Sequence, residues 1–264
     1  MRRVLPGLFM VAAWLLLLWL APQWLFALVI VGLGVLGARE YLAMTGISRQ
    51  GLGVVAPLFI LLLPLAVAWT GRADDVLLAL FFSLLGAVVL VLFRYRRLDG
   101  PVVPLMGLVF GACYVGLCLS HLVLLSALPQ GRSWILLLSG ITAASDTGAY
   151  YSGRTWGRHK LCPHISPGKT REGALGGVVA AMLTSLAIGA WLLPQVSFYR
   201  LALAALVLAV VGIVGDLAES VLKRAYGVKD SGTLLAGHGG VLDRGDSLLL
   251  AAPFLYALLL KGLL

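Results

Sequence analysis

Two acidic side chains lie on one face of a predicted apolar helix that reads Val211-Gly-Ile-Val-Gly-Asp216-Leu-Ala-Glu219-Ser220. Because Asp216, Glu219 and Ser220 stand at positions i, i+3 and i+4, they share one side of that helix. A carboxylate beside hydrocarbon costs roughly 2.5–3.5 kcal/mol and persists where it faces a polar cavity, a cation or a metal. Asp146, near the end of an earlier apolar segment, repeats the pattern. The spacing predicts a polar site at the inner end of the helix.

A glycine-rich stretch with alternating acids and bases follows directly. Its second half reads His238-Gly-Gly-Val-Leu-Asp-Arg-Gly-Asp246, and glycines permit a tight loop whose backbone N–H groups approach a ligand. Carboxylates are the hard oxygen ligands that Mg²⁺ prefers, and Lys and Arg suit phosphate oxygens. The stretch therefore predicts a metal and phosphate site, with solvated ion pairs as the alternative. Its charged residues are Lys223, Arg224, Lys229, Asp230, Asp243, Arg244 and Asp246.

A second polar cluster ends in a predicted helix start. Ser166-Pro-Gly is typical of a turn, and Thr170 is a predicted N-cap with Glu172 in the first turn of the helix that follows. Lys169 beside this helix N-terminus, together with Ser166, predicts a phosphate site. A simple capped loop explains Thr170 and Glu172 equally well.

Composition indicates what class of protein must position these residues. Of the 264 residues, 61% are hydrophobic and 12% are charged, and the mean hydropathy is +1.00. A soluble globular protein carries about 25% charged residues, and a disordered one combines low hydrophobicity with high net charge. Both classes are excluded, so the sequence indicates an integral membrane protein.

Apolar runs long enough to cross a bilayer fill most of the chain. A spanning helix needs about 20 mostly apolar residues. The run over 102–128 contains Pro104, Gly111 and Gly116, which predict a kink or a break. We therefore expect an all-α polytopic membrane protein with about nine spans. The predicted spans are 4–21, 25–44, 53–70, 76–93, 102–128, 133–152, 173–193, 201–222 and 247–264.

Both polar clusters fall in the second half of the chain. Residues 1–132 are mainly hydrophobic helices, whereas residues 133–264 carry the clusters in helix ends and loops. We expect the two halves to form a single membrane domain over 1–264.

The charges between the apolar runs predict the orientation. With the N-terminus inside, the outer side receives only Arg72, Arg132, Arg200 and Lys261 of the 20 Lys and Arg residues. Cytoplasmic loops carry an excess of Lys and Arg, so the N-terminus is predicted to be cytoplasmic and the C-terminus to lie on the opposite side. The net charge of +9 then reflects this asymmetry rather than binding to nucleic acid.

The two clusters resemble those of the phosphatidate cytidylyltransferases, or CDP-diacylglycerol synthases. The stretch Ser220–Asp246 follows that family's signature almost throughout, and Ser145–Tyr150 and Ile165–Gly173 look like its other characteristic stretches. The resemblance covers the C-terminal half, whereas the N-terminal helices match in hydropathy only. Ala236 and Gly245 depart from the family pattern, and both flank the carboxylates without replacing them.

The resemblance implies the reaction CTP + phosphatidic acid → CDP-diacylglycerol + pyrophosphate, with Mg²⁺ as cofactor, alone or with a second cation. The attacking lipid phosphate is already deprotonated, so the site has to position and neutralise charges rather than supply a base. The implied catalytic residues are Asp216, Asp243, Asp246, Lys223, Arg224 and Lys229. The implied metal ligands are Asp216 and Asp243, with Asp146, Asp230 and Asp246 as further candidates. The implied substrate-binding residues are Ser166, Lys169, Thr170, Ser220, His238, Gly239, Gly240 and Arg244.

Two other functions fit the same residues. Another membrane nucleotidyltransferase, or a CTP-using kinase acting on a polyprenol or a different lipid, would use the same metal chemistry. A cation or phosphate transporter would use Asp146 and Asp216 as its ion path, although the acidic residues cluster at one face rather than along a midplane route.

The resemblance favours a role in phospholipid biosynthesis. It implies a multi-pass protein of the inner (cytoplasmic) membrane with its active site facing the cytoplasm, where CTP is available. The expected partners are CTP, phosphatidic acid and the lipid bilayer, without nucleic acid. A homodimer is left open, since membrane dimers are common among such enzymes.

Overall fold

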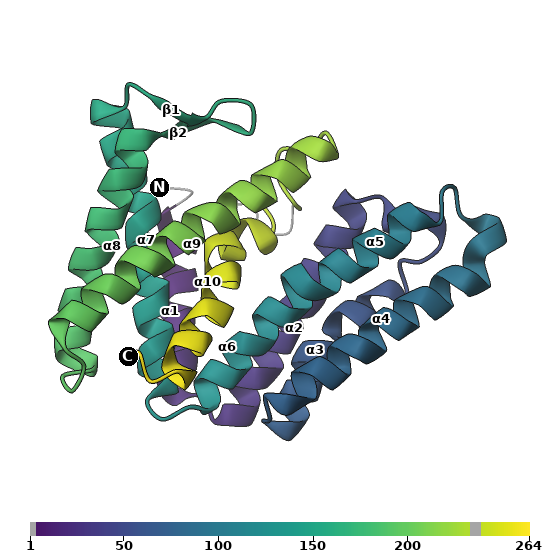
Figure 1. Cartoon of the computed structure of the whole chain (residues 1–264), viewed down its shortest axis with the longest axis horizontal. Coiled ribbons are helices and arrows are strands. Elements are labelled where there is room, and N and C mark those ends of the chain that lie inside the picture. Colours follow the sequence, from purple (N-terminus) through teal and green to yellow (C-terminus); the bar gives the residue numbers. More distant parts are fainter. Residues whose placement is uncertain (1–3, 233–238) are drawn as a thin grey trace. The chain divides into compact units, whose positions relative to one another are not determined.

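The computed structural model describes residues 4–232 and 239–264 (Figure 1). Contacts within the chain divide it into two compact units, and a segment from late in the sequence packs with the N-terminal helices. The first unit comprises Met1–Pro129 and Tyr226–Arg244, and the second comprises Gln130–Ala225 and Gly245–Leu264.

The first unit is a set of apolar helices arranged around α3, which contacts α2, α4 and α6. Its core contains large side chains that are fully buried, among them Phe26, Tyr41 and Ile60. Burial of such side chains is the main favourable term in packing these helices within the unit. The helices are α1 (Val4–Leu20), α2 (Gln23–Met44), η1 (Ile47–Gln50), α3 (Ala56–Thr70), α4 (Asp74–Arg94), η2 (Tyr95–Arg97), α5 (Val102–Gly111), η3 (Ala112–Leu117) and α6 (Cys118–Ala127).

Of the kink or break expected over 102–128, the break does not occur, because the segment 102–127 stays helical throughout. Pro104 lies in the first turn of α5, where its missing N–H removes no intrahelical hydrogen bond. The helix instead changes to π geometry over η3, which contains Gly116. At Gly116 the helix contacts the backbone carbonyl of Ile60 on α3, at a distance that leaves no room for a Cβ.

Gly116→Ala is expected to destabilise the protein by about 1–3 kcal/mol, the usual cost of overpacking. The added methyl group would collide with a backbone oxygen, which cannot swing aside as the end of a side chain can. Thermal unfolding in detergent measures the change, with Gly32→Ala on α2 as the matched control because its Cβ would meet open space. Equal unfolding midpoints for the two variants would contradict the prediction.

The second unit is held together by close contacts between α7, α8 and α9, and α7 and α8 run side by side in Figure 1. Glycines permit this approach: a Cβ on Gly177 would come within 2.7 Å of the Ser145 carbonyl oxygen. Small residues at such crossings are typical of membrane helices. The helices are α7 (Gly131–Trp156), α8 (Arg171–Leu192), α9 (Phe198–Ala225) and, from Gly245 onward, most of α10 (Leu242–Leu260).

A β-hairpin joins α7 to α8 and is the one correction to an all-α description of the described residues. It pairs β1 (Lys160–Cys162) with β2 (Ser166–Thr170) in antiparallel fashion. Ser166-Pro-Gly, predicted as a turn, is the first part of β2, and the turn lies over 163–165. Pro167 is tolerated because each strand of a two-stranded sheet is an edge strand, where a missing N–H can face outward.

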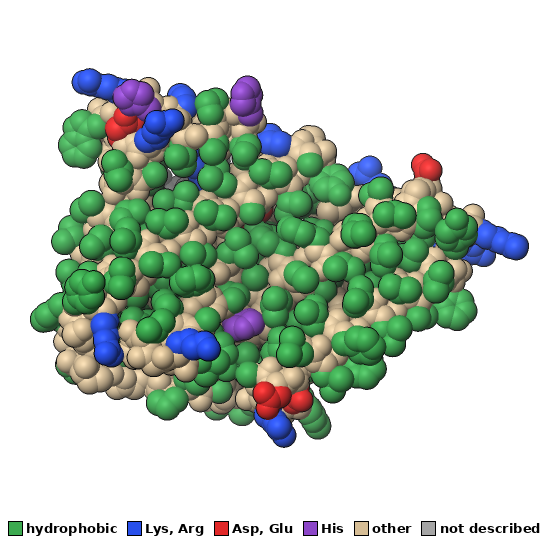
Figure 2. Space-filling view, in the orientation of Figure 1, with side chains coloured by type: hydrophobic (Ala, Val, Ile, Leu, Met, Phe, Trp, Pro, Cys, Tyr) green, Lys and Arg blue, Asp and Glu red, His purple; other side chains and the backbone are tan. Residues whose placement is uncertain are grey.

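The described helices are those of a membrane protein. Five meet the length and hydropathy expected of a membrane span, and hydrophobic side chains are spread over the surface visible in Figure 2. Exposed apolar side chains such as Leu77, Leu183 and Val214 are suited to contact with lipid. The full count of about nine spans, the sidedness of the termini and the single domain stay predictions. The five candidate spans are Gln23–Met44, Asp74–Arg97, Val102–Ala127, Arg171–Leu192 and Phe198–Ala225.

Candidate active site

Three carboxyl groups and two lysines of the second unit form a cluster, here called the acid–lysine cluster. Lys169 Nζ on β2 lies 2.5 Å from Asp216 Oδ2 on α9. One turn further along α9, Lys223 Nζ lies 3.2 Å from Glu219 Oε2, whose side chain is 0% exposed. Asp246 on α10 completes the cluster, because it interacts with Asp216, Glu219 and Lys223. The structure therefore brings together four of the predicted site residues and adds Glu219.

Glycines on α9 allow α10 to approach closely enough to bring Asp246 into the cluster. A Cβ on Gly215 would lie 2.6 Å from the backbone oxygen of Asp246, and one on Gly212 would lie 3.5 Å from the Cβ of Ser247. A larger residue at Gly215 would push the two helices apart, since the obstacle is backbone. The sequence Gly-Ile-Val-Gly-Asp therefore supplies both the carboxylate and the space beside it.

The cluster carries a surplus of negative charge around Asp246. Burial, followed by the nearby charge of Asp216, raises the pKa of Asp246 above its usual value. The carboxyl group of Glu219, which is fully buried, also interacts with that of Asp246. Neighbouring carboxyl groups whose negative charges repel one another are a position where a cation would be stabilised.

Asp216 and Asp246 supply two neighbouring carboxyl groups, which are oxygen ligands of the kind that a divalent cation takes. Mg²⁺ is commonly held by one or two carboxylates and completed by water and substrate phosphates. Among the residues that the structure describes, no group of three or more His, Cys, Asp or Glu side chains is arranged as a metal site. A pair of carboxylates that takes its remaining ligands from water and substrate phosphates fits this preference and needs no third protein ligand.

A second set of interactions lies in the first unit, at the start of α10. Asp243 accepts hydrogen bonds from Ser231 N at 3.0 and 3.1 Å and from Gly240 N at 2.7 Å. These bonds hold Ser231 and Gly240 together, the two ends of the glycine-rich loop 231–240. The predicted role of Asp243 as a metal ligand stays a prediction, and in this structure its carboxylate closes the loop.

Glu40 on α2 holds the same loop and was not predicted from the sequence. Its carboxylate accepts hydrogen bonds from Val241 N at 2.9 Å, Leu242 N at 3.0 Å and the Ser231 hydroxyl at 3.3 Å. The available signal was an acidic residue inside the apolar run 25–44. Because Glu40 lies near the C-terminal end of that run, next to Arg39, its charge suggests only a position at the end of a membrane span.

The N-cap predicted for the helix after the second cluster is confirmed. Thr170 Oγ1 accepts a hydrogen bond from Gly173 N at 3.0 Å. Glu172, in the first turn as predicted, accepts hydrogen bonds from Arg158 N and His159 N, and its carboxylate lies 2.6 Å from His159 Nδ1. These contacts tie the residues just before the hairpin to the start of α8.

The remaining predicted site residues are more scattered. Arg224 is exposed and donates from Nε to the Ile165 carbonyl oxygen at 3.4 Å. Asp230 and Asp243 belong to the first unit, whereas Asp146 is an exposed residue of α7 in the second unit, so their shared role with Asp216 stays a prediction. His238 lies outside the described residues. Lys229 and Arg244 are exposed, Ser166, Ser220 and Gly239 are half-buried, and Gly240 is buried.

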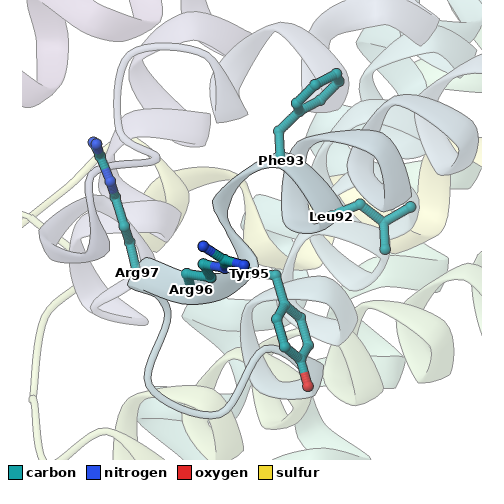
Figure 3. A pocket seen from close by; sticks show the side chains of 5 residues that line it. All are labelled: Leu92, Phe93, Tyr95, Arg96 and Arg97. Carbon is teal, nitrogen blue, oxygen red and sulfur yellow. The ribbon is translucent and has the colours of Figure 1, made fainter.

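A pocket of about 630 Å³ lies at the end of α4 in the first unit. Figure 3 shows its lining side chains pointing in different directions, without convergent polar groups. It contains none of the predicted site residues. Its lining residues are Leu92, Phe93, Tyr95, Arg96 and Arg97.

Comparisons with known proteins cover nearly the whole chain. The model of the cytidylyltransferase family matches residues 1–261. The chain is 35% identical to the phosphatidate cytidylyltransferase of Bacillus subtilis strain 168, over 98% of this chain and 97% of that protein. It is 35% identical to the phosphatidate cytidylyltransferase of Staphylococcus saprophyticus over 87% of both chains. It is 41% identical to the phosphatidate cytidylyltransferase of Brucella suis over 68% of this chain and 64% of the relative. With matches that extend well beyond the polar clusters and through the N-terminal helices, the chain belongs to the cytidylyltransferase family.

Proposed function

We propose that this protein transfers the cytidylyl group of CTP to phosphatidic acid and so makes CDP-diacylglycerol and pyrophosphate. The observation that carries the proposal is the similarity to phosphatidate cytidylyltransferases along almost the full length of both chains. The acid–lysine cluster supports it, because this chemistry needs carboxylates for a metal and lysines for phosphates on one site.

In this reaction a phosphate oxygen of phosphatidic acid forms a bond to the α-phosphorus of CTP, and the bond from that phosphorus to the β-phosphate oxygen breaks. Pyrophosphate leaves with the electron pair. The attacking phosphate is deprotonated at neutral pH, so the residues need not remove a proton. Their task is to hold several negative charges in line and stabilise them. We assign Lys169 and Lys223 to the phosphates, since both ammonium groups lie within the cluster.

Asp216 and Asp246 would hold Mg²⁺, and Asp243, Asp146 and Asp230 are retained as further candidate ligands, for the same ion or a second cation. When bound, the metal ion supplies positive charge to the phosphate oxygens. Lys169 Nζ lies against Asp216 Oδ2, so the lysine is close enough to this candidate metal ligand to contact a substrate phosphate bound there.

We further propose that the site faces the cytoplasm from the inner membrane, where CTP meets a lipid substrate. The apolar helices support a membrane location, and the distribution of Lys and Arg supports this orientation. The homodimer that was left open stays a prediction.

Purified protein in detergent, given phosphatidic acid, α-labelled CTP and Mg²⁺, is expected to place the label in lipid. Replacing Mg²⁺ with EDTA should abolish incorporation, because the phosphates then lose their metal counter-charge. No labelled lipid from a folded preparation would overturn phosphatidic acid as the acceptor.

Parallel reactions with a polyprenyl phosphate, and with diacylglycerol and γ-labelled CTP, then detect another nucleotidyltransferase or a kinase. Ion flux in vesicles without nucleotide would favour a transporter.

A further inference from the structure

Glu40 is a buried carboxylate at a position that the proposed reaction does not explain. It lies near the C-terminal end of α2 and is only 9% exposed. A buried charge is costly unless hydrogen bonds or an opposite charge compensate it. Glu40 accepts three hydrogen bonds. All three donors belong to the glycine-rich loop and the start of α10, about 200 residues away in sequence.

The donors are those that an anion requires. Val241 N and Leu242 N are backbone groups at the N-terminus of α10, where unpaired N–H groups and the helix dipole favour a negative charge. The Ser231 hydroxyl adds a donor from the opposite end of the loop. A single side chain on α2 therefore joins the beginning and the end of the loop to the N-terminal helices.

The surrounding backbone is shaped to fit this side chain. A Cβ on Gly232 would lie 2.6 Å from Glu40 Oε1, and one on Gly240 would lie 2.5 Å from Glu40 Oε2. Both glycines therefore bring the loop backbone against the carboxylate. Asp243 accepts hydrogen bonds from the backbone N–H groups of Ser231 and Gly240, so two carboxylates hold the base of the loop.

We propose that Glu40 is a positioning residue for the reaction: its carboxylate holds the base of the loop and the start of α10, and thereby orients Asp243 and Arg244. This role rests on the proposed function, in which both residues belong to the family signature. Glu40 itself binds neither metal nor substrate. Its effect passes through the hydrogen bonds to Ser231, Val241 and Leu242.

Glu40→Gln tests the proposal with almost no change in volume. The amide NH₂ group would face backbone N–H donors, so at least one of the three hydrogen bonds is lost. We expect kcat to fall by about 10–100-fold, as for residues that orient a site's ligands, with KM for CTP nearly unchanged. Gln23→Ala is the matched control. Gln23 also lies on α2, and the change removes its 2.6 Å side-chain hydrogen bond to Ser126 on α6. Its kcat should equal that of the wild type.

A measurement without substrate separates this inference from the proposed function. Hydrogen exchange of peptides that contain Val241 and Leu242 should accelerate in Glu40→Gln and stay at the wild-type rate in Gln23→Ala. Ser231→Ala, which removes only the hydroxyl donor, provides a milder variant that tests the same contact if Glu40→Gln does not fold.

If hydrogen exchange around Val241 and Leu242 is unchanged in both Glu40→Gln and Ser231→Ala, Glu40 does not hold the loop and the proposal is overturned. Faster exchange with a kcat equal to that of Gln23→Ala would overturn the positioning role. If wild-type protein makes no CDP-diacylglycerol, the proposed function fails, and the exchange rates still decide whether Glu40 fixes the start of α10.

Discussion

Asp216→Asn is expected to reduce turnover by about 10²–10³-fold, the loss seen when one electrostatic contact to the developing charge is removed. The amide keeps the shape of the side chain but removes half of the carboxylate pair proposed to hold Mg²⁺. It also leaves Lys169 without its charged partner at 2.5 Å. Both side chains of that ion pair are partly exposed, so the loss should appear in activity and metal binding rather than in folding.

The matched control is Asp74→Asn, the same chemical change at an ion pair with Arg72 whose side chains are 86% and 70% exposed. Turnover of CTP and binding of Mn²⁺, followed by its electron paramagnetic resonance signal, are measured for both variants. Asp74→Asn should match the wild type in both. If Asp216→Asn binds Mn²⁺ as tightly as the wild type, Asp216 is not a metal ligand, whatever happens to its turnover.

Much of the fold could be predicted because the rules involved are local. Apolar runs of sufficient length form helices in a bilayer, since every backbone group must be satisfied within its own segment. The described helices follow the predicted runs, and Thr170 is an N-cap as expected from its type and position. The β-hairpin was missed because Ser166-Pro-Gly favours a turn locally, whereas the pairing of Ser166 with Cys162 decides the outcome.

The site was predictable only as far as its residues lie close together in sequence. Asp216 and Lys223 share a helical face, and that periodicity is visible in the sequence. The contact of Lys169 with Asp216 depends on how β2 meets α9, and the contacts of Glu40 join residues 191 to 202 positions apart. Glu219 was noted as a polar neighbour, yet its complete burial depends on the packing of the second unit.

Lys223→Met is expected to lower the free energy of unfolding by about 3–5 kcal/mol, because it leaves a buried carboxylate without its cation. Glu219 is 0% exposed and the Lys223 side chain is 14% exposed, so water cannot replace the lost charge. Turnover should fall as well, since Lys223 is assigned to substrate phosphate. Lys261→Met is the control, as it removes an exposed lysine from the end of the same unit.

The double variant Glu219→Gln/Lys223→Met distinguishes the two roles of Lys223. Removing both charges should recover most of the stability, because replacing a complete buried pair with neutral groups is often close to neutral in energy. If Lys223 binds phosphate, turnover of the double variant stays about 10²-fold below that of the wild type despite the recovered unfolding midpoint. If turnover returns together with stability, Lys223 only compensates Glu219, and the phosphates must be held by Lys169 and the remaining basic residues.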